Sequence, residues 1–251
     1  MSGAMDSSLD LPAPPALAEL VAEGPLALFL DFDGTLVEIA STPDEIIVPG
    51  DLNRRIEALS ARLHGRLALV SGRAVDNLEQ HCGSLAVARA GSHGLACFTA
   101  DGEQLGDKPS RLPADLLDAL GTFAASEGFT LEAKPHGAAL HYRSDPALEE
   151  RGKLFATSFA DDNGLSVKCG KCVIELVQPG ADKASAVRAF MAEPPFRGSR
   201  PVFVGDDLTD EDGFAAARAL GGFGVLVGGR SPTAAKYGLA DPAAVQQWLD
   251  L

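Results

Sequence analysis

The sequence has few cysteines and few basic residues for its length of 251 residues. Four cysteines do not form the disulfide framework typical of small secreted proteins in a chain this long. The 21 lysine and arginine residues are outnumbered by 35 aspartate and glutamate residues, which gives a formal net charge of −14. This balance argues against nucleic acid and anionic membranes as partners, because both attract basic surfaces. An anionic small molecule remains open, since a local lysine or metal ion decides its binding.

The sequence also lacks a long apolar run and a basic leader followed by apolar residues. No run approaches the roughly 20 residues that a membrane-spanning helix needs. Residues 1–15 are small, polar and proline-rich, which does not match a secretion signal. We therefore expect a cytoplasmic protein with a disordered tail over residues 1–20, and no obligate protein partner is evident.

One cysteine pair, Cys169 and Cys172, has the two-residue spacing of metal and redox sites. No second pair follows it, and the surrounding residues are typical of a strand. Residues three apart in a strand face opposite sides of the sheet. We therefore interpret both cysteines as structural.

An apolar run, Leu26 to Leu30, ends abruptly in two acids, Asp31 and Asp33. Such a run predicts a buried strand of a parallel sheet, and open α/β sheets bind ligands at the carboxyl ends of such strands. Alternation along the strand lets both carboxylates point the same way, where they repel unless a cation or a proton separates them. A strand that ends in an ordinary Asp-Gly turn is the alternative.

Strands and helices are expected to alternate on both sides of this run. The apolar patterns predict them at residues 51–63, 67–70, 73–81, 85–90, 182–191, 201–204, 210–220 and 223–227, with a terminal helix near Trp248. This order predicts an α/β fold, with a doubly wound, Rossmann-like parallel-sheet core over residues 21–107 and 180–251. Residues 108–179 instead show an αββαββ order, which predicts an inserted α+β domain with an antiparallel sheet covered by helices on one face.

Polar side chains end three of the expected core strands. Ser71 follows the second strand, and Asp206 and Asp207 follow a later one, while Lys183 begins a helix. Carboxylates suit Mg²⁺, and a lysine with a hydroxyl suits a phosphoryl group. Taken one at a time, the ordinary alternatives are a helix cap for Ser71, a surface position for Lys183 and a turn for Asp206 and Asp207. The occurrence of all these polar residues together around successive strand ends favours phosphoryl transfer.

The two acids after the first strand suit two different roles in that chemistry. Asp31 is the natural nucleophile, because a carboxylate can carry a phosphoryl group as an aspartyl-phosphate. Asp33 can protonate the leaving oxygen and then activate the water that breaks the intermediate.

These residues resemble the four ordered motifs of haloacid dehalogenase superfamily phosphatases, namely Leu30–Leu36, Ser71-Gly72-Arg73, Lys183 and Gly205-Asp206-Asp207. The resemblance implies Asp31 as nucleophile and Asp33 as general acid and base. It also implies Ser71 and Lys183 as catalytic phosphoryl binders. The Mg²⁺ ligands that it implies are the side chains of Asp31 and Asp206 and the carbonyl of Asp33. Residues 108–179 are similar to the α+β cap domain of that superfamily.

A narrower resemblance is to trehalose-6-phosphate phosphatases, through the segments Gly91–Gly94, Leu140–Arg143, Gly170–Glu175 and Gly205–Asp212. In that family the last cap motif grips sugar hydroxyls, which implies this role for Lys171 and Glu175. The substrate-binding residues implied are Ser71, Gly72, Arg73, His93, Arg143, Lys171, Glu175, Asp207 and Glu211. Residues 171 and 175 share one face of a strand, so a solvated sheet face is the alternative.

The expected function is Mg²⁺-dependent hydrolysis of trehalose 6-phosphate to trehalose and inorganic phosphate. Another capped phosphatase, acting on sucrose phosphate or a mannosyl phosphate, is the alternative within enzymes. A signalling receiver or a non-catalytic phosphosugar sensor is the alternative outside them. Receivers lack an inserted cap, and their phosphorylated aspartate lies mid-chain.

Overall fold

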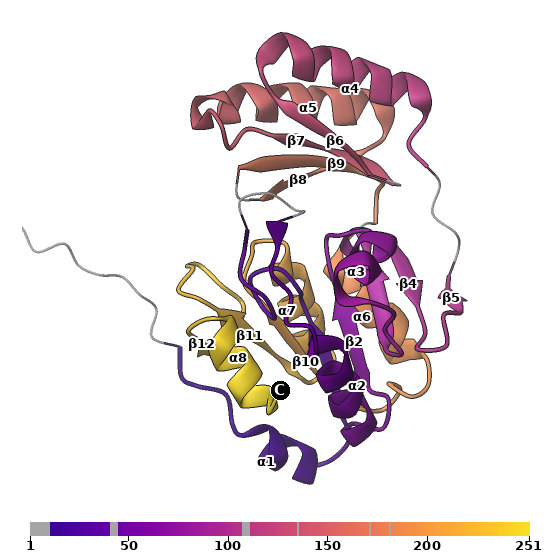
Figure 1. Cartoon of the computed structure of the whole chain (residues 1–251), viewed down its shortest axis with the longest axis vertical. Helices are drawn as coiled ribbons and strands as arrows, with labels where there is room; N and C mark the ends of the chain where they lie inside the picture. Colours follow the sequence, from indigo (N-terminus) through magenta and orange to yellow (C-terminus); the bar gives the residue numbers. More distant parts are fainter. Residues whose placement is uncertain (1–10, 41–44, 107–110, 135, 171, 181) are drawn as a thin grey trace, which may run out of the picture.

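The computed structural model describes residues 11–40, 45–106, 111–134, 136–170, 172–180 and 182–251. Two separate sheets organise these residues, one in the core and one above it (Figure 1). The core sheet has the strand order β12-β11-β10-β1-β2-β3-β4-β5, and the upper sheet has the order β6-β7-β9-β8. None of the helices within the described ranges is long and apolar enough to cross a bilayer.

The strand β1 (Leu26–Leu30) lies in the middle of the core sheet and is buried along its whole length. It pairs in parallel with β10 (Arg200–Gly205) on one side and β2 (Leu67–Val70) on the other. The remaining core strands are β11 (Phe223–Val227), β12 (Tyr237–Leu239), β3 (Ala88–Gly91), β4 (Ala96–Phe98) and β5 (Gln104–Leu105). Within the described core sheet, β4 pairs antiparallel with β3 and β5, and the other neighbouring strands pair in parallel. Asp31 and Asp33 therefore emerge at the centre of the carboxyl edge.

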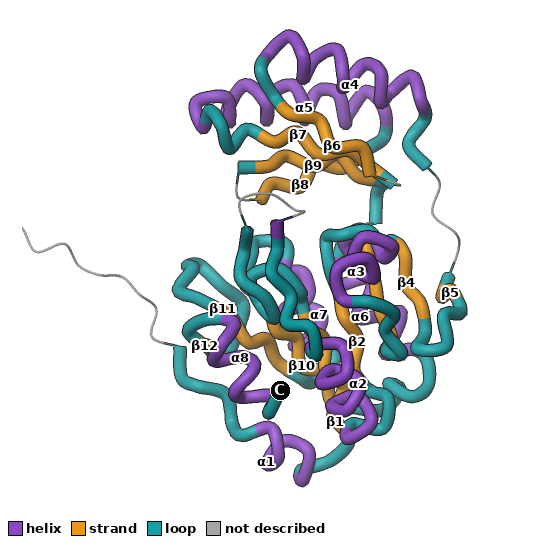
Figure 2. Tube along the Cα trace, viewed as in Figure 1, coloured by secondary structure: helices purple, strands orange, loops and turns teal. Residues whose placement is uncertain are grey.

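Helices cover both faces of the core sheet (Figure 2), which confirms the predicted doubly wound fold. Leu26, Leu28 and Leu30 pack against α1 (Leu17–Ala22), α2 (Leu52–Arg62), α3 (Val75–Cys82) and α8 (Pro242–Leu249). The alternate residues Ala27 and Phe29 pack against α6 (Lys183–Ala192) and α7 (Asp210–Ala219). Each fully buried leucine or phenylalanine in these layers contributes about 1.5–3 kcal/mol.

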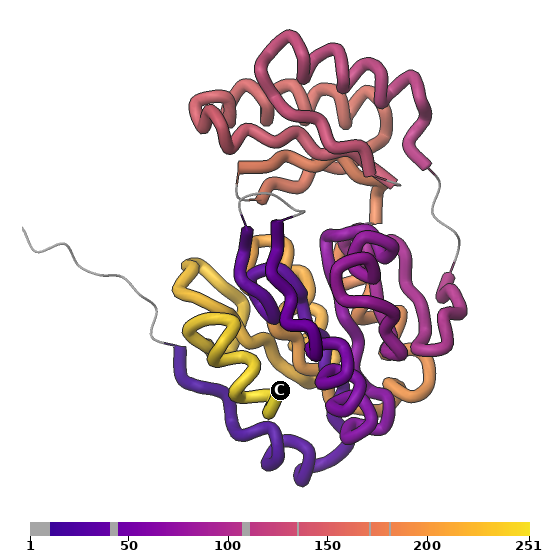
Figure 3. Tube along the Cα trace, viewed as in Figure 1, coloured from indigo at the N-terminus to yellow at the C-terminus, as the bar shows by residue number. Residues whose placement is uncertain are grey.

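The upper sheet belongs to a cap that contains α4 (Ala114–Glu127), β6 (Thr130–Lys134), β7 (Gly137–His141), α5 (Glu149–Asn163), β8 (Ser166–Gly170) and β9 (Val173–Val177). Both helices cover the face away from the core (Figure 2). On this face the rings of Phe123 and Phe155 stack with centroids 3.5 Å apart. The other face of the sheet is turned toward the carboxyl edge of the core. Figure 3 shows that the whole cap is one continuous stretch of chain between β5 and α6.

The predicted disordered tail is wrong for residues 11–20, because this segment packs against the core. Leu17 and Leu20 of α1 are buried, and the indole Nε1 of Trp248 donates a hydrogen bond to the carbonyl of Pro15 at 2.8 Å. The proline-rich composition concealed this segment, because a short helix with two anchoring leucines has little periodicity to detect. Residues 1–10 lie outside the described residues.

Candidate active site

A cavity of about 1070 Å³ lies between the carboxyl edge of the core sheet and the open face of the cap sheet. The core contributes most of the residues selected from the sequence: Asp31, Asp33, Gly72, Arg73, His93, Lys183, Asp206 and Asp207. The cap contributes Thr130, Glu132, Lys134, His141, Arg143 and Glu175, among others. Side chains that are far apart in the sequence therefore meet around one space.

Lys183 lies between two carboxylates at the bottom of this cavity. Its Nζ donates hydrogen bonds to Oδ1 of Asp31 at 2.7 Å and to Oδ1 of Asp210 at 2.6 Å. All three side chains are buried. Burial alone would lower the pKa of Lys183, but the charges of Asp210 and Asp31 outweigh it and raise the pKa, so the lysine stays charged.

Sequence reasoning missed the site role of Asp210, because an acid in the first turn of a helix has an ordinary explanation in the helix dipole. Besides accepting from Lys183, its Oδ2 accepts a hydrogen bond from the backbone N–H of Asp207 at 2.9 Å. Asp210 is the first residue of α7, and its side chain folds back over the end of β10. The spacing of three residues from Asp207 to Asp210 was the available signal.

The acids of the core edge carry more negative charge than Lys183 neutralises. Burial raises the pKa of Asp31 well above its usual range; Lys183 opposes this shift, and Asp210 and Asp206 add to it. Burial and then the charge of Asp210 raise the pKa of Asp206 to about 7. Carboxylates with raised pKa values are those that gain most when a cation joins them.

The residues of this edge fit a divalent cation. Carboxylate oxygens of Asp31, Asp206 and Asp210 lie within 4.8 Å of one another. Oδ1 of Asp206 is buried and has no hydrogen-bond partner among the described residues. Gly34 has a φ of +79°, and a Cβ at this position would overlap the carboxylate of Asp206, so only glycine leaves room for that group. An all-oxygen donor set of this kind suits Mg²⁺.

Asp33 is held by Arg73 through a pair of hydrogen bonds. Nε and NH2 of the guanidinium each lie 2.7 Å from one carboxylate oxygen, and NH1 donates to Oδ1 of Asn77 at 2.8 Å. Ser71 is fully buried, and its Oγ accepts from the backbone N–H of Arg73 at 3.1 Å. The hydroxyl therefore orients the loop that carries Arg73, and it does not cap α3, whose N-cap is Ala74.

His93 joins the core to the cap. Its φ of +58° lies in the left-handed region and follows a φ of +51° at Ser92, a strained pair of the kind that persists at functional sites. Its ring packs on Gly72, where a Cβ would lie 2.7 Å from Cε1. Its Nε2 pairs with the carboxylate of Glu175 in β9.

Glu175 lies between two partners, because Lys134 of β6 binds its other oxygen. Burial alone would raise the pKa of Glu175, but His93 and Lys134 outweigh it and hold the pKa far below its usual range. Beside this group, Nε2 of His141 pairs with Glu132 at 2.8 Å. Sequence reasoning missed Glu132 and Lys134, although the alternation along β6 places them on one face.

Glu211 and Asp207, two further predicted substrate-binding residues, differ in their relation to the cavity. The carboxylate of Glu211 does not face the cavity: it pairs with Arg230 and accepts from the N–H of Ala234. Asp207 lines the cavity beneath the cap, where a Cβ on Gly170 would lie 3.4 Å from its Oδ2.

Two cap residues complete the comparison with the sequence-based predictions. NH1 of Arg143 donates to the carbonyl of Ala40 at 3.0 Å and thereby links the cap to the core. Lys171 lies outside the described residues. A further link between the two parts is the pair of Lys168 and Asp212 at 2.9 Å.

Cys169 and Cys172 both pack against the hydrophobic cluster of the cap. The prediction that they face opposite sides is wrong, because β8 ends at Gly170 and Cys172 lies in the turn, with a φ of +60°. Packing against this cluster supports their structural interpretation.

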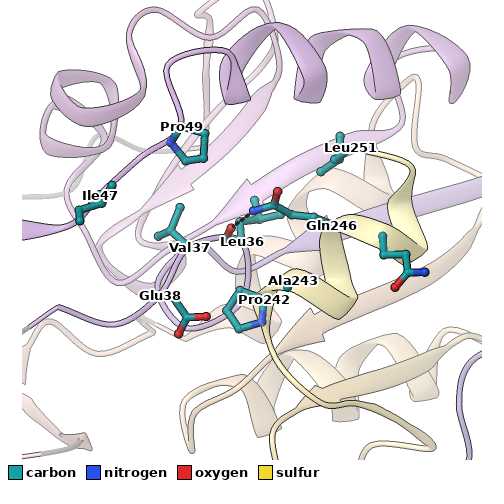
Figure 4. Close-up of a pocket in the computed structure, with 10 residues that line it drawn as sticks. Leu36, Val37, Glu38, Ile47, Pro49, Pro242, Ala243, Gln246 and Leu251 are labelled. Atoms are coloured by element: carbon teal, nitrogen blue, oxygen red, sulfur yellow. Dashed lines mark hydrogen bonds between the residues drawn. The ribbon is translucent and has the colours of Figure 1, made fainter.

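A second cavity, of about 440 Å³, lies between α8 and residues 36–38 and 47–49 (Figure 4). Nε2 of Gln246 donates to the carbonyl of Leu36 at 2.9 Å across its floor. Of the described residues that line it, Glu38 alone is acidic, so these residues do not offer the charge needed for phosphoryl transfer.

Comparisons with known proteins were made for the whole chain. A family model described as trehalose-phosphatase matches residues 29–243. The trehalose-6-phosphate phosphatase of Escherichia coli is 37% identical over 228 residues, covering 90% of this chain and 85% of that protein. A probable trehalose-phosphate phosphatase of Sinorhizobium fredii is 36% identical over 225 residues, covering 84% and 81%.

Solved structures show the same architecture. A protein described as related to trehalose-6-phosphate phosphatase has a TM-score of 0.71 and 26% identity, covering 90% of this chain and 95% of its own. The C-terminal domain of the C. albicans trehalose-6-phosphate phosphatase shares the fold, with a TM-score of 0.80 at 24% identity over 95% and 96% of the two chains. The resemblance predicted from the motifs is confirmed, and this chain belongs to the trehalose-phosphatase family of phosphoric monoester hydrolases.

Proposed function

We propose that this protein is a Mg²⁺-dependent phosphatase that converts trehalose 6-phosphate to trehalose and inorganic phosphate through an aspartyl-phosphate. The contact of Asp31 with Lys183 inside a cavity that both the core and the cap line is the observation that carries this proposal. The substrate is inferred from the named relatives in Escherichia coli and Sinorhizobium fredii. The same family membership disfavours a receiver or a sensor.

Asp31 begins the reaction as the nucleophile. One of its carboxylate oxygens forms a bond to phosphorus as the bond from phosphorus to the sugar oxygen breaks. Asp33 donates a proton to the leaving oxygen, so trehalose departs as a neutral alcohol. Because Arg73 contacts both oxygens of Asp33 in this structure, it fixes the direction in which this carboxyl group points.

Asp33 then acts as a base in the second half of the reaction. It removes a proton from water, the resulting hydroxide oxygen bonds to phosphorus, and the bond to Asp31 breaks. Lys183 and Ser71 hold the phosphoryl oxygens throughout. Mg²⁺, held by Asp31, Asp206 and the carbonyl of Asp33, would neutralise charge on the phosphoryl group.

The cap supplies the grip on the sugar. Glu132, Lys134, Glu175 and His141 line the cavity with hydrogen-bonding groups that suit neutral hydroxyls. We propose the same role for Lys171, and we place the cap at residues 108–179 and the core at residues 11–107 and 180–251. A cap that closes over the phosphoryl site excludes water until the ester has reacted.

The experiment is a phosphate-release assay of the purified protein with trehalose 6-phosphate, sucrose 6-phosphate and mannose phosphates, with and without Mg²⁺. We expect the highest kcat/KM for trehalose 6-phosphate and a strict Mg²⁺ requirement. A higher kcat/KM for a competing ester would overturn the substrate assignment and favour another type of capped phosphatase.

The variant Asp31→Asn tests the nucleophile. We expect kcat to fall by about 10⁴-fold or more, with the far-ultraviolet circular dichroism spectrum unchanged. Because burial makes an ionised Asp31 unfavourable, the neutral amide should not lower Tm in the absence of a divalent cation. Retained turnover in this variant would contradict the mechanism.

A further inference from the structure

Glu211 belongs to the fourth sequence motif, yet the reaction proposed above leaves it without a role. Its Oε1 pairs with the guanidinium of Arg230, and its Oε2 accepts from the N–H of Ala234 at 2.7 Å. Arg230 follows β11, the strand next to β10 in the core sheet. The loop after β11 is therefore tied to the first turn of α7.

The guanidinium of Arg230 also reaches two backbone carbonyls at the end of β10. Its NH2 lies 3.3 Å from the carbonyl oxygen of Asp207, and its Nε lies 3.5 Å from that of Asp206. On the other side, the N–H of Asp207 donates to Asp210 at 2.9 Å. The peptide group between residues 206 and 207 is thus held at its carbonyl and at its amide. Because a peptide group is planar, holding both ends fixes its orientation.

This peptide group begins at the Cα of Asp206, which carries the carboxylate. The buried Oδ1 of that carboxylate has no partner among the described residues. A rotation of the peptide would move that oxygen relative to Asp31 and Asp210. Mutation of a group that orients a metal ligand typically costs about 10- to 100-fold in metal affinity. We propose that Arg230, braced by Glu211, is a positioning residue that sets the Asp206 carboxylate for a divalent cation. This inference rests on the proposed Mg²⁺-dependent function.

Three variants test it: Arg230→Met, Arg230→Lys and Glu211→Gln. The measurements are the Mg²⁺ concentration for half-maximal phosphate release and, without substrate, the rise in Tm that Mg²⁺ produces. We expect Arg230→Met to raise the half-saturating concentration about tenfold or more. Arg230→Lys keeps the charge but loses the planar fork, so its effect should be intermediate. Glu211→Gln should give a rise of about two- to fivefold.

The variant Arg89→Met is a matched control. Arg89 also pairs with a glutamate, Glu79, at 2.7 Å, and donates to the carbonyls of Val87 and Thr99 at 3.3 and 3.4 Å. It lies outside the residues that line the large cavity. Its removal should lower Tm without changing either response to Mg²⁺.

The outcomes separate the possible roles. A raised KM for trehalose 6-phosphate with an unchanged response to Mg²⁺ would make Arg230 a substrate contact and overturn the inference. A lowered Tm alone, as in the control, would make it a loop brace and overturn the inference equally. A wild-type protein whose activity and Tm ignore Mg²⁺ would instead contradict the proposed function.

Discussion

Two buried charge clusters lie on the walls of the large cavity, and their charges are arranged in opposite ways. In the core cluster, the cation Lys183 lies between the carboxylates of Asp31 and Asp210. In the cap cluster, the carboxylate of Glu175 lies between Lys134 and His93. Asp206 adds more negative charge to the first cluster, whereas the second cluster is balanced by its own members. The core cluster therefore suits a metal ion and phosphoryl chemistry, and the cap cluster suits a neutral polyol.

The largest expected effect comes from removing the central cation of the core cluster. Lys183→Met leaves Asp31 and Asp210 buried without their partner, so we expect kcat to fall about 10²- to 10³-fold. The free energy of unfolding should fall by about 3–5 kcal/mol. Phosphate release and urea unfolding measure the two quantities.

Lys153→Met serves as its control, because Lys153 forms an exposed pair with Glu149 on α5. That change should leave kcat unaltered and affect the free energy of unfolding far less than Lys183→Met does, because water screens an exposed ion pair. If both lysine variants behaved alike, the contrast between a catalytic cluster and ordinary ion pairs would be lost.

Removing the central anion of the cap cluster should act on substrate binding instead. Glu175→Gln keeps the shape of the side chain but removes the negative charge that lies between Lys134 and His93. We therefore expect KM for trehalose 6-phosphate to rise about tenfold, with a smaller change in kcat. Steady-state kinetics at saturating Mg²⁺ measure both constants. Glu127→Gln, which alters a cap carboxylate paired with Arg151, should change neither. A loss confined to kcat would show that Glu175 acts on the chemical step. It would contradict the proposal that the core cluster serves the chemistry and the cap cluster serves substrate binding.

The smallest expected effect is a pH dependence of stability that distinguishes the clusters. Burial and Asp210 raise the pKa of Asp206 to about 7 in the folded state, so the folded state holds this proton more tightly than the unfolded state does. Its contribution to stability is therefore lost as pH rises from about 4 to 7. The lowered pKa of Glu175 has the opposite sign, and its contribution is lost only as pH falls below about 4.5.

In a chelator, we expect the free energy of unfolding to fall by about 2 kcal/mol between pH 5 and pH 7.5, which corresponds to about 5 °C in Tm. Added Mg²⁺ should remove most of this fall, because it replaces the proton at the core cluster. Without Mg²⁺, Asp206→Asn should remove part of the fall, because the raised pKa of Asp31 contributes with the same sign. A fall of undiminished size in that variant would assign the titration to groups other than Asp206.

The core site was predictable from the sequence because its residues follow apolar strands directly. Asp31, Ser71 and Asp206 each occupy the first positions after a buried parallel strand, and parallel strands bring their carboxyl ends to one edge. The fold class followed from the same alternation of strands and helices. Asp210 escaped the prediction because an acid in a first helical turn has an ordinary explanation in the helix dipole.

The cap was less predictable because its site depends on pairing between strands. Lys134 meets Glu175 only because β7 lies between β6 and β9 in the sheet order, which no local pattern reveals. Glu211 matched a motif, yet its orientation is set by Arg230 on a neighbouring strand loop. Register and loop contacts are non-local, so single-sequence patterns predict the residue types and not their neighbours.

The insertion of the cap as one continuous stretch between β5 and α6 has a consequence for the evolution of substrate choice. A single recombination event with two crossover points exchanges every sugar-facing cap side chain and leaves Asp31, Lys183 and Asp206 in place. A lineage with this arrangement can acquire a new substrate while its chemical machinery is transmitted unchanged. Duplication followed by cap exchange is then a shorter route to a new phosphatase than point mutation around the nucleophile.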